Sequence, residues 1–205
     1  MNDFKFKDTN LDLDLLKRDC RRINTKVIKE FGHNKLLENT RYNQVLAEQL
    51  SQAPQSSKLH DFYNVFSFPY DGIYELYKEV CSFFKEVCVY NEQYYVHAWL
   101  NYQYKGESIP WHYHWKGLSG LDKTYVCTFH INANNSKTTH KFKNDNIVFI
   151  NNRNNTITLY EDKGDIHMVD MWEEDEPRIS ISMDFVPKKY IQGSTFLINT
   201  WLPII

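Results

Sequence analysis

Seven short runs between residues 94 and 186 decide the fold: YYVHAWLNYQY (94–104), IPWHYHW (109–115), TYVCTFHIN (124–132), NIVFIN (146–151), TITLY (156–160), DIHMVDMW (165–172) and RISISMDFV (178–186). β-branched and aromatic residues fill these runs, and turn-forming residues such as Gly, Asn and Asp separate them. Each run has the length of one strand. A train of such strands predicts a mainly β protein built as an antiparallel sandwich or barrel.

The chain before this train has a different pattern. Apolar residues recur at helical spacing over 11–31 and 71–89, and residues 43–50 could form a further short helix. The stretch SQAPQSS at 51–57 is typical of a surface loop. Helices followed by strands indicate a sheet braced on one face by helices. We expect a single domain over 1–205, with a mainly helical elaboration at 1–90, a strand-built core at 91–187 and a C-terminal extension at 188–205.

Composition excludes several classes of protein. The 24 basic and 26 acidic side chains are mixed along the chain and give a formal net charge of -2, so no polybasic surface for nucleic acid or membrane is indicated. No apolar run approaches the roughly 20 residues that span a bilayer, and the first residues do not resemble a signal peptide. We therefore expect a cytoplasmic protein. Frequent Asn, Ile, Lys and Tyr are typical of AT-rich genomes, including those of phages.

Two further features concern cysteine and the C-terminus. The four cysteines show no CxxC spacing, so they are expected to be small core residues and not disulfide partners or zinc ligands. The ending FLINTWLPII (196–205) is apolar enough to cover a sheet edge or a neighbouring subunit, which leaves a homodimer open.

Three histidines have a spacing suited to a metal ion. His112 and His114 lie two apart, so on a strand both side chains project from one face. His167 follows the Gly164-Asp165 turn about fifty residues later and can reach back toward this pair. Two strand histidines and a third from a distant strand make a facial site with open positions. An HxH pair alone is weak evidence; the third histidine favours metal binding. The other histidines lack such spacing, and only a different strand register would add His130 or His140.

The last strand has one polar face. Arg178, Ser180, Ser182 and Asp184 alternate with apolar residues along RISISMDF. A buried guanidinium needs an acceptor, and an Arg and a Ser two apart offer a planar fork and a hydroxyl suited to a carboxylate. An anionic co-substrate is one candidate partner. An internal acid such as Asp165 or Asp184, or exposure on an edge strand, remains an alternative.

These residues resemble two known families. G-x5-HxH followed by G-x2-H resembles the metal-binding strands of the cupin superfamily, without the glutamate that cupins usually place after HxH. The longer run WLNYQYKGESIPWHYHWKGLSG (99–120), with His167 and RISISMDF, is more similar to the 2-oxoglutarate/Fe(II)-dependent oxygenases, especially the small prolyl-hydroxylase-like group of phages and bacteria. In that superfamily an arginine follows the last metal-ligand histidine by about ten residues, as Arg178 follows His167.

The resemblance covers about half the chain, residues 94–186. It implies a double-stranded β-helix (a jelly roll, cupin-like) with N-terminal helices packed on one sheet. It also implies Fe(II) held by His112, His114 and His167, with 2-oxoglutarate as co-substrate. Arg178 and Ser180 would bind the distal carboxylate of 2-oxoglutarate. The further candidate contacts to the co-substrate or to the metal ligands are Asn101, Tyr104 and Tyr125.

One departure and two alternatives accompany this hypothesis. His114 stands where most of the superfamily has Asp or Glu, so a three-histidine site carries one more positive charge. The leading function is hydroxylation of a peptide side chain or a small metabolite with O2. The alternatives are a cupin-like three-histidine dioxygenase that works without 2-oxoglutarate, and a non-catalytic jelly-roll protein of viral origin. Arg178 and Ser180 disfavour the first alternative, because it needs no carboxylate-binding residues there. The metal content of the purified protein would test the second.

Overall fold

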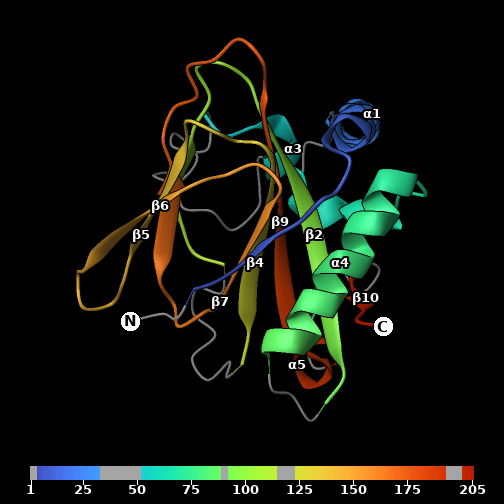
Figure 1. The fold of residues 1–205 in the computed structure, drawn as a ribbon, viewed down its shortest axis with the longest axis vertical. Helices are drawn as coiled ribbons and strands as arrows, with labels where there is room; N and C mark the ends of the chain where they lie inside the picture. Colours follow the sequence, from blue (N-terminus) through green and yellow to red (C-terminus); the bar gives the residue numbers. More distant parts are fainter. Residues whose placement is uncertain (1–3, 33–51, 89–91, 115–122, 193–199) are drawn as a thin grey trace.

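The computed structural model describes residues 4–32, 52–88, 92–114, 123–192 and 200–205. Its strands form two antiparallel sheets (Figure 1). The six-stranded sheet has the order β1 (Lys5–Asp8), β7 (Thr156–Glu161), β4 (Tyr125–Asn132), β9 (Arg178–Pro187), β2 (Tyr94–Gln103), β10 (Leu202–Pro203). The four-stranded sheet has the order β3 (Ile109–His112), β8 (Ile166–Val169), β5 (Lys137–Lys141), β6 (Ile147–Asn151). This architecture is the predicted double-stranded β-helix.

The two faces of the larger sheet have opposite chemistry, because side chains alternate along each strand. On β9, Ile179, Ile181, Met183 and Phe185 belong to the main apolar core. The polar side chains between them contact residues of the smaller sheet and its connections, as Arg178 does with Ser136 and Asp184 with His114. The apolar core therefore lies on the outer side of the larger sheet, and a polar interior lies between the sheets.

Two helices cover the apolar side of the larger sheet, α1 (Leu13–Phe31) and α4 (Asp71–Val87) (Figure 1). Asp12 caps α1 by accepting hydrogen bonds from the backbone N–H groups of Asp14 and Leu15. The ring of Phe84 on α4 stacks on Phe185 of β9, with centroids 4.5 Å apart. The helices predicted over 11–31 and 71–89 are confirmed, whereas the one predicted over 43–50 lies outside the described residues.

The stretch at 51–57 is more than the predicted surface loop. It contains the start of α3 (Gln55–Lys58), which is followed by the short helices η2 (His60–Phe62) and η3 (Val65–Ser67). Ser56 Oγ accepts a hydrogen bond from the backbone N–H of Tyr102, and Ser57 Oγ donates one to Asn101 Oδ1. These bonds attach α3 to β2.

Both ends of the described chain add a strand to the larger sheet. β1 pairs with β7, and β10 pairs with β2 at the other edge. The last residues therefore cover a sheet edge, one of the two roles expected for them. A short helix, α5 (Lys188–Gln192), follows β9. All four cysteines are buried and free, as predicted.

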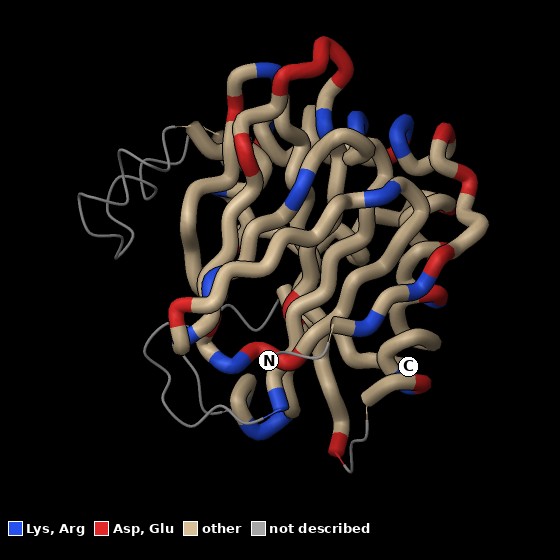
Figure 2. The backbone as a smooth tube through the Cα atoms, turned by 60° about the vertical axis from the view of Figure 1, so that its left-hand side comes forward, with Lys and Arg blue, Asp and Glu red and all other residues tan. Residues whose placement is uncertain are grey.

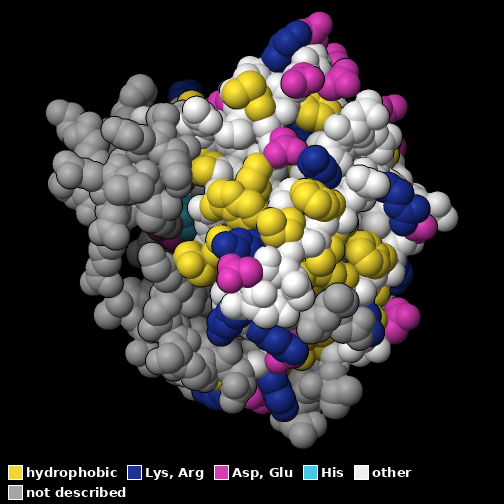
Figure 3. All heavy atoms as spheres, turned by 90° about the vertical axis from the view of Figure 1, so that its left-hand side faces the viewer, with side chains coloured by type: hydrophobic (Ala, Val, Ile, Leu, Met, Phe, Trp, Pro, Cys, Tyr) yellow, Lys and Arg dark blue, Asp and Glu magenta, His cyan; other side chains and the backbone are white. Residues whose placement is uncertain are grey.

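Along the described backbone, Lys and Arg positions are interspersed with Asp and Glu positions (Figure 2). Acidic residues gather in the connection between β8 and β9, at 173–176. Apolar side chains gather on the face shown in Figure 3, where β6 exposes Ile147 and Phe149. None of the described helices combines the length and the apolar character needed to cross a membrane.

Candidate metal centre

The three predicted metal ligands meet between the sheets. His112 ends β3 and lies opposite His167 of β8, and His114 follows two residues later. One ligand nitrogen from each residue lies within 4.8 Å of the others. The ring centroids of His112 and His167 are 4.2 Å apart, and those of His114 and His167 are 4.9 Å apart. The neighbouring strands β3 and β8 thus bring together residues distant in sequence.

One pair of nitrogens already has the separation that a shared ion requires. Nε2 of His114 lies 3.4 Å from Nε2 of His167. When two nitrogens each lie about 2.1 Å from one ion, and the angle between them at the ion is between a right angle and the tetrahedral angle, they are roughly 3.0–3.4 Å apart. As whole residues all three are partly buried. Three imidazoles at this spacing fit a first-row divalent metal ion that keeps open positions.

Each histidine has a partner for its second ring nitrogen. Nδ1 of His112 is 2.8 Å from the carbonyl oxygen of Pro110, and Nδ1 of His114 is 2.6 Å from Oδ1 of Asp184. Nδ1 of His167 is 3.4 Å from the hydroxyl of Tyr160. Metal-binding histidines donate their other N–H to such groups, which fixes the tautomer and the ring orientation. These contacts leave the Nε2 atoms available for a metal ion.

The protonation of the three rings follows from burial and charge. Burial, helped by the charge of His114, lowers the pKa of His112 to about 4. Burial and the neighbouring histidines hold the pKa of His167 well below its ordinary value. Burial also opposes the charged form of His114, but the Asp184 carboxylate outweighs it and the pKa of His114 is raised. His112 and His167 are therefore held as neutral imidazoles, the form that binds metals.

Arg178 is a buried cation, with 1% of its surface exposed. Its Nε donates to Ser136 Oγ at 3.1 Å, and its Nη1 donates to Ser180 Oγ at 3.1 Å and to Gln103 Oε1 at 3.5 Å. Over the described ranges these partners are all uncharged. Burial lowers the pKa of Arg178 to about 10. The site is therefore suited to an anionic ligand, which would offset the cost of the buried charge.

The other candidate contacts divide into two groups. Asn101 lies opposite Ser180 on the inner face, and its Nδ2 donates to Ser182 Oγ at 2.8 Å. Tyr104, in contrast, is 50% exposed and packs edge-on against Tyr102. Tyr125 packs against Phe84 of α4 on the other face of the sheet. Tyr104 and Tyr125, which were expected to contact a co-substrate, thus lie away from the space between the sheets.

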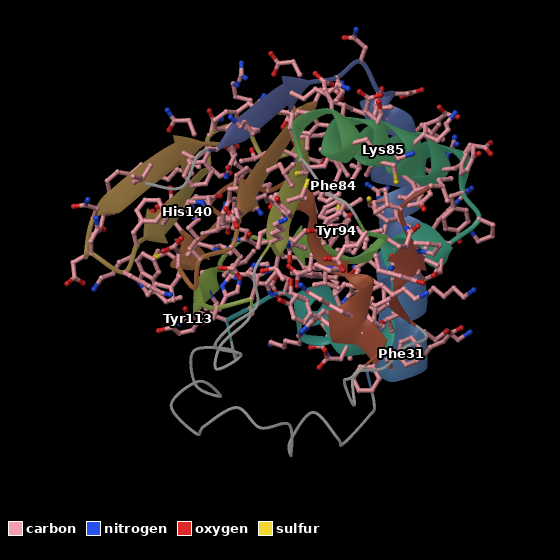
Figure 4. The ribbon with its side chains drawn as sticks, turned by 90° about the horizontal axis from the view of Figure 1, so that it is seen from below. Phe31, Phe84, Lys85, Tyr94, Tyr113 and His140 are labelled. Atoms are coloured by element: carbon pink, nitrogen blue, oxygen red, sulfur yellow. The ribbon has the colours of Figure 1, made fainter. Side chains whose placement is uncertain are left out.

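The sequence did not indicate the place of two further residues beside the histidine cluster. Asp184 was considered only as a partner of Arg178, whereas it contacts His114. His140 on β5 lies opposite His167, and the two ring centroids are 5.2 Å apart. In Figure 4, His140 and Tyr113 lie on one side of the molecule, away from Phe84 and Tyr94 beside α4. The alternation of inward residues on β5 and β9 is the only sequence signal for these positions.

His130 lines a separate part of the interior. Its Nδ1 is buried without a hydrogen-bond partner among the described residues. Burial and the positive charge of Arg178 lower the pKa of His130 to about 3. A cavity of about 300 Å³ adjoins it, with Thr158 and Asn151 among the other wall residues. The polar interior therefore extends from the histidine cluster past Arg178 toward β6.

Comparisons with known proteins identify the fold. No family model and no curated protein matches the chain. Among solved structures, the non-heme alpha-ketoglutarate-dependent carbocyclase SnoK from nogalamycin biosynthesis is 8% identical, with a TM-score of 0.58 over 91% of this chain and 80% of that one. EctD from S. alaskensis, solved with bound Fe, is 9% identical, with a TM-score of 0.50 over 91% of this chain and 73% of that one.

A third structure matches a smaller share. A 2OG-Fe(II) oxygenase family oxidoreductase from Burkholderia pseudomallei is 14% identical, with a TM-score of 0.46, and the match covers 56% of each chain. This chain thus spans little more than half the length of that protein. The match to SnoK confirms the resemblance at the level of the fold: the chain has the double-stranded β-helix of the 2-oxoglutarate/Fe(II)-dependent oxygenases.

Proposed function

We propose that this protein is an Fe(II)- and 2-oxoglutarate-dependent dioxygenase that hydroxylates a peptide side chain or a small metabolite. The observation that carries the proposal is the pairing of two features on facing sheets. Three histidines with the spacing of metal ligands lie on the smaller sheet and its connection. Arg178, which is buried and whose partners among the described residues are uncharged, lies on the larger sheet.

The donor set supports iron as the metal. Three imidazole nitrogens with open positions suit Fe(II), Zn(II) and neighbouring ions, so the ligands alone do not choose between them. Arg178 favours Fe(II), because a chelating keto acid is the co-substrate of that chemistry. With Fe(II) and 2-oxoglutarate bound, the site would couple oxidative decarboxylation of the keto acid to hydroxylation of a C–H bond.

Arg178 and the histidines lie toward different ends of the same stretch of the smaller sheet. Ser136, which accepts from Arg178 Nε, lies four residues before His140, and His140 is the neighbour of His167. A ligand that contacts both the histidines and the guanidinium would need a binding group at each end. A five-carbon keto dicarboxylate meets this requirement.

The remaining inward residues would orient that ligand and limit water. Ser180 would add a hydroxyl beside the guanidinium fork, which suits a carboxylate. Asn101 is 4% exposed and is fixed by bonds to Ser57 and Ser182, so it can hold a defined orientation beside the ligand. Because these groups are buried, their hydrogen bonds to a ligand would be stronger than in water.

Measurements of metal and 2-oxoglutarate binding distinguish this function from the two alternatives. A cupin-like dioxygenase would use the same histidines without a keto acid, and a non-catalytic jelly-roll protein would bind no metal. Titration calorimetry with Mn(II), a less oxidisable substitute for Fe(II), followed by 2-oxoglutarate, distinguishes them. We expect one metal ion per chain and 2-oxoglutarate binding only after the metal. The His167→Ala variant should bind neither ligand tightly.

The other results would reject the proposal in different ways. Metal binding without 2-oxoglutarate binding would favour the cupin-like dioxygenase. Absence of metal binding by the wild-type protein would favour the non-catalytic alternative.

A further inference from the structure

We propose that Asp184 acts through His114 as the anionic partner of the metal centre. Three neutral histidines supply no negative charge to the metal, and Asp184 would supply it from outside the coordination sphere. This inference rests on the proposed function, because it requires a metal ion at the three histidines. It assigns Asp184 a positioning role and not a ligand role.

The contact is short, buried and directed. Asp184 Oδ1 lies 2.6 Å from Nδ1 of His114, and the two side chains are 10% and 3% exposed. On the other side of the same ring, Nε2 of His114 faces Nε2 of His167 at 3.4 Å. The carboxylate thus holds one nitrogen of the ring and leaves the opposite nitrogen toward the metal position. In this arrangement the Nδ1–H donates to Asp184.

Asp184 differs from the outer partners of the other two histidines. His112 contacts the backbone carbonyl of Pro110, and His167 contacts the hydroxyl of Tyr160, so both of those partners are neutral. Of the three cluster histidines, His114 alone has a carboxylate partner among the described residues. A divalent ion with three neutral ligands in a largely buried site is poorly compensated, and a carboxylate one ring away lowers that cost.

The position of Asp184 in the fold gives the contact its rigidity. Asp184 belongs to the central strand β9, which is paired on both sides, with β2 and with β4. His114 lies after β3, at the smaller sheet. The hydrogen bond therefore connects His114, which lies beyond the end of β3, to a strand that is paired on both sides.

Metal affinity tests the role of the charge. We would measure Mn(II) dissociation constants for the wild type, Asp184→Asn and Asp162→Asn by titration calorimetry. Asp184→Asn retains shape and a hydrogen-bond acceptor but removes the charge, and it should weaken metal binding about 10- to 100-fold. Asp162 is the matched control: it is buried and accepts a hydrogen bond from Gly164 N, and it acts on His114 only through space, without a hydrogen bond. Its variant should weaken Mn(II) binding much less than Asp184→Asn does.

A double-variant cycle separates this role from a merely structural one. In a His114→Asp background the carboxylate would stand at the metal itself, and Asp184 would repel it. There, Asp184→Asn should leave Mn(II) affinity unchanged or increase it. A structural role predicts the same loss in both backgrounds. That result, or an unchanged affinity in Asp184→Asn alone, would overturn the inference while leaving the proposed function intact. Absence of metal binding by the wild type would overturn both.

Discussion

Arg178 is an unusual residue for a protein interior. It is fully enclosed by uncharged described partners, Ser136, Ser180 and Gln103, although a guanidinium loses much hydration on burial. Burial of a cation without an acidic partner among the described residues costs free energy, and under the proposed function an anionic ligand would offset that cost. We therefore expect Arg178 to lower the stability of the ligand-free protein and to favour the binding of an anion.

Arg178→Met should make the ligand-free protein more stable, because it replaces a buried cation with an apolar chain of similar length. We expect a gain of about 1–4 kcal/mol, as for other buried charges replaced by apolar groups. The melting temperature would rise by roughly 2–4 °C per kcal/mol. Calorimetric melting with and without Mn(II) and 2-oxoglutarate measures both effects: 2-oxoglutarate should stabilise the wild type and not the variant. Arg153→Met, at an exposed arginine, is the control.

A variant that melts lower than the wild type and is still stabilised by 2-oxoglutarate would show that Arg178 has a structural role only.

Spacing along the chain was enough to single out four side chains that lie between the sheets. His112, His167 and Arg178 are on strands, whose alternation fixes the face of each side chain, whereas His114 lies two residues after the end of β3. Tyr104 and Tyr125 were assigned from the resemblance alone. On β4 the alternation of Tyr125 with Val126 and Thr128 already places Tyr125 on the apolar face. The contact of Asp184 with His114 joins two sheets, so no local pattern predicts it.

At the scale of elements, β9 joins the two halves of the protein. One of its faces belongs to the apolar core beneath the helices, and the other presents Arg178, Ser180 and Asp184 to the polar interior. The helices thereby support the site from behind. The sequence predicted α1 and α4 because their apolar periodicity is long. It missed β1 and β10 because two- and four-residue strands depend on pairing with distant partners.

Phe84→Ala should destabilise the protein strongly, since Phe84 connects α4 to β9 by stacking on Phe185. Deleting a fully buried phenylalanine costs about 3–5 kcal/mol. Urea unfolding followed by far-ultraviolet circular dichroism measures the change. Phe149→Ala removes the same side chain from an exposed position on β6 and should change the unfolding free energy little. Equal losses in the two variants would contradict the placement of the core between helices and larger sheet.

At the scale of the whole molecule, the protein has three layers: helices, a large sheet and a small sheet (Figure 1). The main apolar core lies between the first two layers, and the histidine cluster, His140 and Arg178 lie between the last two. The space between helices and large sheet thus serves mainly stability, and the space between the two sheets holds the candidate site. This separation predicts that buried histidines, and not the apolar core, dominate the acid sensitivity of the fold.

His130 offers a test of this prediction away from the metal ligands. Its pKa falls from about 6.5 in an unfolded chain to about 3 in the fold, through burial and the charge of Arg178. Between these values the unfolded chain binds a proton that the folded chain does not, so stability declines as the pH falls. His130→Asn should reduce the stability lost between about pH 6.5 and about pH 4.5 by about 2 kcal/mol. Urea unfolding at both pH values measures it, and identical pH slopes would contradict the account.

We propose that three histidines and Arg178 together hold a metal-chelated keto acid. The most direct test is an anaerobic titration of the metal-free protein with Fe(II) and then 2-oxoglutarate, followed by visible absorption, in the wild type and in Arg178→Met. A charge-transfer band of the chelated keto acid in the wild type, absent or much weaker in the variant at equal ligand concentration, is the predicted result. An equally strong band in both proteins, or no band in the wild type after Fe(II) has bound, would contradict the claim.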